Sequence, residues 1–120
     1  MPDAGSPLLV ALSGLPGSGK TTVARALATR LGAVHVRVDV IETALATSDA
    51  VSLADHPELG YSVAYALASD HLRNGISVVA DTVNPVAVTR EAWRRVAADA
   101  GARVLDVEAT GNIAVIRLGT

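Results

Sequence analysis

The sequence contains no cysteine and no phenylalanine, and its aromatic residues are limited to Tyr61, Tyr65 and Trp93. Without cysteine the chain can form no disulfide, offers no thiolate nucleophile and cannot build a cysteine-ligated zinc site. This absence fits the cytoplasm, and we expect a cytoplasmic location. Alanine, valine and leucine supply most of the apolar residues. Such small side chains favour helices packed closely on a buried sheet.

An excess of charge of one sign is also missing, because the formal net charge is −2. This balance argues against a broad electrostatic grip on nucleic acid, so any anion site must be local. The apolar run over residues 7–12 is too short to span a bilayer, and it lacks the basic flank of a secretory signal. We interpret the run as a buried strand, and we expect neither a nucleic acid partner nor a membrane.

Lysine is nearly absent, since Lys20 is the only one and the other nine basic residues are arginines. It stands in a stretch that matches the G-x-x-x-x-G-K-[ST] pattern of a phosphate-binding loop: Gly14, Leu15, Pro16, Gly17, Ser18, Gly19, Lys20 and Thr21. An apolar run leads into the stretch and an amphipathic helix starts within it. An ordinary glycine-rich turn would need the glycines but no Lys-Thr at its end. The pattern therefore predicts a site for a nucleoside triphosphate.

The motif indicates how a triphosphate would be held. Its glycines let the backbone curl without Cβ clashes, so the amides can point inward as an anion-binding nest. The start of the helix adds the positive end of its dipole. Lys20 is predicted to bridge the β- and γ-phosphates, Thr21 to coordinate Mg²⁺ through its hydroxyl, and Thr22 to contact the α-phosphate.

The rest of the chain alternates between strand and helix patterns. The expected strands are Leu8–Leu12, Val34–Val38, Ile76–Ala80, Arg103–Val107 and a short fifth, Ile113–Leu118; the expected helices are Lys20–Leu31, Asp39–Ala46, Tyr61–Asn74 and a last one from a cap at Asn84 and Pro85 to Ala100. This alternation predicts an α/β fold whose parallel sheet carries helices on both faces. Residues 1–7 are expected to form a disordered leader, and residues 8–120 one nucleotide-binding domain.

Two aspartates follow strands of the predicted sheet. Asp39 comes after Val34–Val38 and Asp81 after Ile76–Ala80, and open α/β sheets bind ligands at the carboxyl ends of their strands. Asp81 is predicted to hold Mg²⁺, with a solvated loop residue or a turn cap as the alternative. Asp39 is the candidate catalytic base for a substrate hydroxyl. Its alternative is structural, because Asp39 and Glu42 also match a capping box at a helix start.

For several other residues the sequence supports only less specific predictions. Arg37 is expected to orient a substrate or to pair with an acid, and Trp93 is expected to be an anchor of the core or of a groove. Arg90 and Arg94 share a helix face, for which a solvated surface is favoured over contact with phosphate. The histidines show no metal-ligand spacing. The irregular segment 47–57 is the expected substrate loop.

Four segments between about Leu8 and Glu108 match one group of proteins: LSGLPGSGKTT, VHVRVDVIE, GYSVAYALASDHLRNGISVVADTVNP and TREAWRRVA. They resemble the small bacterial P-loop kinases, in particular the "AAA family ATPase" or zeta-toxin-like group, which includes chloramphenicol phosphotransferase-like and gluconate kinase-like proteins. The resemblance implies a three-layer P-loop NTPase fold with strand order 2-3-1-4-5. It also implies ATP- and Mg²⁺-dependent phosphoryl transfer to a small-molecule hydroxyl, with Asp39 as the base or acceptor-binding residue and Asp81 on the metal side.

The C-terminal part departs from this group. Its members continue after the fourth strand with an arginine-rich lid helix, which supplies positive charge to the transferring phosphoryl group. Here Arg117 is the only arginine beyond Arg103, so we expect a C-terminally shortened domain without the lid. Two functions remain as alternatives: a small-molecule kinase, or a nucleotide-binding protein or weak ATPase without efficient phosphotransfer. A nucleic-acid-associated ATPase is disfavoured by the acidic charge.

Overall fold

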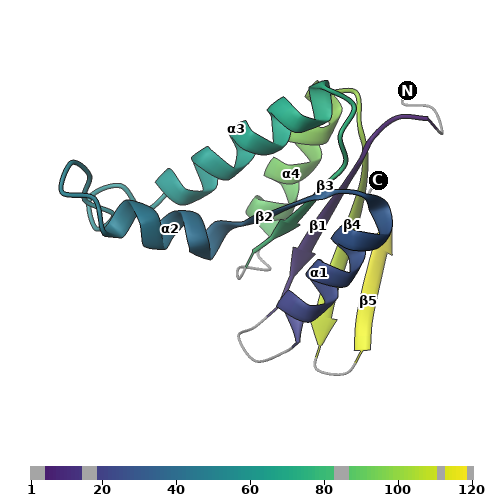
Figure 1. The fold of residues 1–120 in the computed structure, drawn as a ribbon, viewed down its shortest axis with the longest axis horizontal. Helices are drawn as coiled ribbons and strands as arrows, with labels where there is room; N and C mark the ends of the chain where they lie inside the picture. Colours follow the sequence, from purple (N-terminus) through teal and green to yellow (C-terminus); the bar gives the residue numbers. More distant parts are fainter. Residues whose placement is uncertain (1–4, 15–18, 83–86, 111–112, 119–120) are drawn as a thin grey trace.

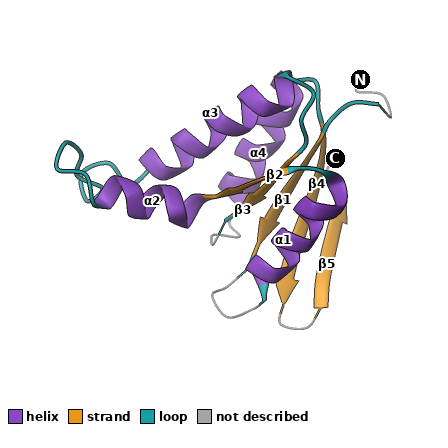
Figure 2. Cartoon of the chain, viewed as in Figure 1, coloured by secondary structure: helices purple, strands orange, loops and turns teal. Residues whose placement is uncertain are grey.

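The computed structural model describes residues 5–14, 19–82, 87–110 and 113–118, with the backbone alone for residues 87–89, 110 and 113–118. Its elements in chain order are β1 (Leu8–Ser13), α1 (Lys20–Leu31), β2 (Val34–Arg37), α2 (Val38–Ala46), α3 (Leu59–Arg73), β3 (Val78–Asp81), α4 (Ala87–Asp99), β4 (Arg103–Thr110) and β5 (Ile113–Leu118). Figures 1 and 2 show the strands side by side with the helices around them. None of the described helices is long and apolar enough to cross a membrane.

The sheet has the strand order β2-β3-β1-β4-β5. Its first four strands pair in parallel, which confirms the predicted α/β class and the order 2-3-1-4 of a P-loop NTPase fold. The fifth strand has the predicted bounds but runs antiparallel to β4, with Thr110 opposite Ile113. The connection between them is residues 111–112. So short a connection can close a hairpin, whereas a parallel return needs a crossover of about a dozen residues or more.

Two apolar clusters fill the space on the two faces of the sheet. One packs α3 and α4 against Leu9, Ala11 and Val78, and the other packs α1 against Val10 and Leu12. Successive residues of a strand point to opposite faces, so the apolar run of β1 contributes to both clusters. The three-layer arrangement that the resemblance implied is therefore present.

Small side chains let the helices lie close to the sheet. Ala24 and Ala28 of α1, like Ala64 and Ala68 of α3, are buried and four positions apart, which places each pair on one helix face. Alanine also has the highest helix propensity, so the same residues favour the helix and its close packing. The small number of aromatic residues in the sequence thus agrees with a core in which small side chains separate the helices from the sheet.

Trp93 of α4 lies in the core, as predicted. It is 1% exposed, and its ring meets Tyr65 of α3 in an edge-on contact with 4.6 Å between ring centroids. Burial raises the pKa of Tyr65, and the nearby Tyr61 raises it further. Both tyrosines pack against the α3–α4 side of the core. The three aromatic residues therefore join these two helices to the sheet.

Backbone caps end α1, α3 and α4, and each uses a glycine with positive φ: Gly32 (61°), Gly75 (80°) and Gly101 (68°). After α3, the Ile76 N–H donates to the His71 carbonyl at 3.0 Å. This bond and the left-handed Gly75 form a Schellman motif. The motif ties Ile76 to the end of the helix, so the prediction that the strand starts at Ile76 is wrong and β3 begins at Val78.

The chain ahead of β1 is held against the start of β4. The Arg103 N–H donates to the Pro7 carbonyl at 2.9 Å, and the Arg103 guanidinium donates to the Ser6 carbonyl at 2.8 and 3.2 Å. Leu8 and Arg103 are partners in the β1–β4 ladder. These bonds continue the alignment of the two strands beyond the sheet.

At Gly60, α3 lies close to the Glu42 side chain of α2. A Cβ added there would lie 2.4 Å from Cγ of Glu42. We expect Gly60→Ala to lower the free energy of unfolding by about 1–2 kcal/mol, because the overpacking outweighs the better helix propensity of alanine. Urea unfolding followed by circular dichroism measures this change.

The Glu42→Ala variant provides the matched background, because it removes the atoms that the new methyl group would meet. In that background Gly60→Ala should be neutral or stabilising, since only the gain in helix propensity remains. Equal destabilisation in both backgrounds would show that contact with Glu42 is not the cause.

Candidate nucleotide-binding site

The phosphate loop begins where β1 ends, and α1 opens immediately after its last glycine. Gly19 has a φ of 81° and directly precedes Lys20, the first residue of α1. A positive φ favours glycine, which is the residue that the motif requires here. The Val23 N–H donates to the Gly19 carbonyl at 3.1 Å and so closes the first turn. The predicted nucleotide contacts Leu15, Pro16, Gly17 and Ser18 lie outside the described residues.

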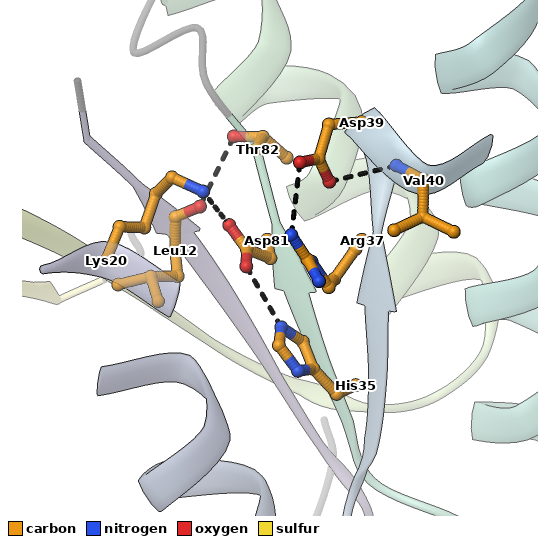
Figure 3. Close-up of polar contacts among 8 residues, drawn as sticks. All are labelled: Leu12, Lys20, His35, Arg37, Asp39, Val40, Asp81 and Thr82. Carbon is orange, nitrogen blue, oxygen red and sulfur yellow. Dashed lines mark hydrogen bonds and ion pairs between the residues drawn. The ribbon is translucent and has the colours of Figure 1, made fainter. Parts of the chain in front are cut away.

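Lys20 is buried at the start of α1, with 8% of its surface exposed. Its ammonium group forms an ion pair with Oδ1 of Asp81 (Figure 3). The parallel pairing of β1 with β3 places Asp81 opposite Leu12, at the end of the strand that leads into the loop. Asp81 is the last residue of β3 and is 2% exposed. The strand register thus brings together two predicted site residues from distant parts of the sequence.

His35 of β2 holds the other oxygen of the same carboxylate. Its Nε2 lies 3.0 Å from Oδ2 of Asp81 (Figure 3), and because a carboxylate only accepts, the Nε2–H is the donor. Sequence reasoning missed this role, because it tested the histidines only for metal-ligand spacing. The available signal was the polar alternation of β2, which places His35 and Arg37 on one face of the strand.

Thr82 holds the backbone that carries Asp81. Its N–H donates to the Leu12 carbonyl at 2.9 Å, and its hydroxyl donates to the same oxygen at 3.3 Å. Thr82 is 3% exposed. These bonds extend the contact between β1 and β3 beyond the last residue of β3 (Figure 3).

Asp39 lies in the first turn of α2, at the same end of the sheet as Asp81 (Figure 3). Its Oδ2 accepts from Nη2 of Arg37 at 3.2 Å and its Oδ1 from the Val40 N–H at 2.9 Å, and 51% of the side chain is exposed. The alternative role of Asp39 in a capping box is wrong, because α2 begins at Val38 with Arg37 as its N-cap. Asp39 is therefore open to solvent and paired with a cation.

Oxygen donors suited to Mg²⁺ are present at this end of the sheet. Thr21 carries a hydroxyl in the first turn of α1, and Asp81 carries a buried carboxylate. Within the part of the chain that the structure describes, no group of three or more His, Cys, Asp or Glu residues could hold a metal. Mg²⁺ commonly takes one or two protein oxygens and completes its shell with waters and substrate phosphates. The residues present therefore fit a Mg²⁺ ion that arrives with a nucleotide.

Comparison with known proteins decides the family. Residues 9–118 match AAA_33, a family described as an AAA domain. The chain belongs to this AAA domain family. The matched range includes Lys20, Asp39 and Asp81, so each of these candidate site residues lies inside the AAA domain.

A curated relative of this AAA domain is named "Probable adenylyl-sulfate kinase" and comes from Aeropyrum pernix. It is 33% identical over 104 residues, which cover 83% of this chain and 57% of the relative. The AAA domain therefore spans little more than half of that relative's length.

Solved structures have the same fold. The Mycobacterium tuberculosis APS kinase CysC in complex with AMPPNP and APS has a TM-score of 0.67 at 28% identity, with 87% of this chain and 62% of that chain covered. A gluconokinase from Sinorhizobium meliloti 1021 has a TM-score of 0.54 at 22% identity, with 83% and 57% covered, and this likeness concerns the fold alone. The AAA domain thus has a P-loop kinase-like fold, which supports nucleotide binding.

An arginine of α4 pairs with a buried carboxylate in this AAA domain. Nη2 of Arg94 donates to Oδ2 of Asp106 at 2.8 Å, and Asp106 lies in β4 with 3% of its surface exposed. The expectation of a solvated surface is therefore wrong for Arg94. The reason is that a buried carboxylate needs a charged or hydrogen-bonding partner, and the sequence pattern of α4 alone does not reveal that a neighbouring strand presents one.

The expected substrate loop, residues 47–57, follows the C-terminal end of α2 (Figure 1), whereas Asp39 lies in the first turn of that helix. A surface hollow of about 570 Å³ opens there, lined by Asp49, Ala50, Val51, Ser52, Asp55, His56 and Leu59. None of the described candidate residues of the phosphate site lines it. In this AAA domain the described candidate residues gather instead where β1, β2 and β3 end.

Proposed function

We propose that this protein binds Mg·ATP at its phosphate loop and transfers the γ-phosphate to a hydroxyl group of a small molecule. The observation that carries the proposal is the placement of Lys20, which is buried in the first turn of α1 with the carboxylate of Asp81 beside it. Membership of the AAA domain family and the identity to a relative named as a kinase support the same activity.

Nucleotide binding would exchange one anionic partner of Lys20 for another. The ammonium group pairs with Asp81 in the structure. The β- and γ-phosphates would take the place of this carboxylate, because a charged donor binds phosphate oxygens strongly. Mg²⁺, when bound, would neutralise charge on the phosphates, and Thr21 and Asp81 are the residues that we propose to hold it.

Phosphoryl transfer would use Asp39 as the base. The acceptor oxygen would form its bond to the γ-phosphorus while the bond to the bridging oxygen of ADP breaks, and the carboxylate of Asp39 would take the hydroxyl proton. Arg37 would keep this carboxylate at the end of β2, because its Nη2 lies 3.2 Å from Oδ2 of Asp39. The chain would contribute chiefly positioning and fixed positive charge.

The identity of the phosphate acceptor has to be tested with a panel of compounds. Adenylyl sulfate is the first compound to test, because a relative of 33% identity is named for it. The finer grouping with zeta-toxin-like and chloramphenicol phosphotransferase-like kinases stays a prediction, so sugars, nucleosides and antibiotics complete the panel. ADP release from Mg·ATP with and without each compound is the measurement, and stimulation by one of them is the expected result.

A nucleotide-binding protein or weak ATPase is the second candidate. In its favour, the family match and the P-loop kinase-like fold support nucleotide binding, which is all that this candidate needs, whereas transfer to an acceptor is a separate property. ATP binding by calorimetry, together with slow ADP release that no compound stimulates, would favour this candidate over the kinase.

The Asp39→Asn variant tests the base. We expect acceptor-stimulated turnover to fall about 100- to 10,000-fold, because the amide accepts no proton from the acceptor. ATP affinity should stay within about threefold, because both described interactions of the Asp39 side chain are with Arg37 and Val40 rather than with the phosphate loop. The matched control is Asp70→Asn on the exposed surface of α3, which should leave turnover unchanged. Equal turnover in the two variants would exclude Asp39 as the base.

A further inference from the structure

The carboxylate of Asp81 is held from two sides. Lys20 of α1 pairs with its Oδ1 and His35 of β2 donates to its Oδ2. The side chain of Asp81 is 1% exposed, so water has almost no access to either oxygen. Among the described residues, no other side chain is seen to donate to Oδ2.

The proposed function requires Lys20 to leave this arrangement. When the ammonium group turns to the phosphates, Asp81 loses its partner at Oδ1 while a second anion arrives nearby. A buried acceptor that loses its partner costs free energy, and a buried charge costs more. The bond from His35 is the one described side-chain interaction of Asp81 that does not depend on Lys20.

We propose that His35 is a positioning residue that keeps Asp81 in place while Lys20 binds the nucleotide. This inference rests on the proposed function and adds a residue to it. His35 needs only the hydrogen on Nε2 for this role, so either the neutral or the charged ring serves. Its effect reaches the phosphates through Asp81 and Lys20 rather than by contact.

The position of His35 in the sheet suits this role. In the pairing of β2 with β3, His35 lies opposite Val79 and Arg37 lies opposite Asp81. His35 therefore shares a face with Asp81 and reaches its Oδ2 along the sheet. The ring is 16% exposed, which restricts its movement. A donor on a strand of the sheet stays fixed while the lysine side chain turns to the phosphates.

The decisive experiment compares His35→Leu with His35→Gln by calorimetry of AMPPNP, once with EDTA and once with Mg²⁺. Leucine removes the donor, whereas glutamine places an amide N–H near the position of Nε2. With EDTA we expect binding to His35→Leu to be about tenfold weaker than to the unmodified protein, because Asp81 is left without a partner. His35→Gln should bind within about threefold of the unmodified protein.

Magnesium separates this role from a general loss of structure. The ion and its waters would give Asp81 a new partner, so the loss in His35→Leu should be smaller with Mg²⁺ than with EDTA. Unchanged affinity of His35→Leu with EDTA would overturn the inference, as would equal weakening in His35→Gln. Failure of the unmodified protein to bind AMPPNP would instead refute the proposed function.

A second measurement needs no variant and decides the matter if His35→Leu does not fold. Nitrogen-15 NMR of the imidazole ring in the unmodified protein reports which ring nitrogen carries hydrogen. We expect the Nε2–H of His35 to be present before AMPPNP is added and to persist after it. Loss of this hydrogen when the nucleotide binds would contradict the proposed role.

Discussion

Lys20→Met should abolish measurable ATP turnover, with a loss of at least about 100- to 1,000-fold, because one well-placed donor at a developing negative charge supplies about 3–4 kcal/mol. Methionine retains the unbranched side chain as far as Cε but lacks the ammonium group. The sequence contains no other lysine, so no second ammonium group is available. ADP release and calorimetry with Mg·ATP measure turnover and binding separately.

The control for this variant is Arg25→Met, which removes a cation from an exposed position of the same helix and should leave turnover unchanged. Lys20→Met also deprives the buried Asp81 of a partner, so its stability needs a check of its own. Adding Asp81→Asn removes the buried charge and should recover stability without recovering nucleotide binding. Full turnover in folded Lys20→Met would refute the phosphate-loop assignment.

Trp93→Ala should cost about 3–5 kcal/mol in the free energy of unfolding, which is the usual range when a large buried ring is deleted. Trp93 is 1% exposed and meets Tyr65 at 4.6 Å between ring centroids, at the junction of α3 and α4. The cavity would lie between two helices and the sheet, where the close packing of small side chains leaves little material to fill it. Urea unfolding followed by circular dichroism measures the change.

Trp93→Phe is the matched variant, because it keeps an aromatic ring in contact with Tyr65. It also removes Nε1, which is buried and makes no hydrogen bond among the described residues. We expect this variant to lose less than half of what Trp93→Ala loses, because the ring contact remains and no hydrogen bond is broken. Similar losses in the two variants would show that the shape of the indole ring, rather than the apolar volume, is what the site requires.

The sequence predicted those parts of the fold that depend only on residues close together in the chain. The apolar run of β1 leads to glycines and then to Lys20, and strand, loop and helix follow in that order. Gly32 ends α1 in the left-handed conformation, and this local backbone conformation by itself favours glycine. The order of the four parallel strands was implied by the resemblance to P-loop kinases and agrees with the structure.

Element ends were predicted less well, because several backbone arrangements compete within a turn. Ile76 continues an apolar run, yet its N–H closes the cap of α3 and it does not enter β3. Asp39 and Glu42 have the spacing of a capping box, yet α2 starts at Val38, two residues earlier than that motif requires. At Ile76 the two solutions are a strand start and a helix cap, and the hydrogen bond to His71 selects the cap.

Local sequence was enough to identify a phosphate loop on a strand and a helix, because its glycines, its lysine and the apolar run before it are consecutive in the chain. The partners of the loop depended on tertiary structure. Lys20 and Asp81 are 61 positions apart, and His35 and Asp81 are 46 apart. These pairs meet because the registers of β1, β3 and β2 align the ends of three strands. A register results from the packing of the whole sheet between its two layers of helices, and no short segment encodes it.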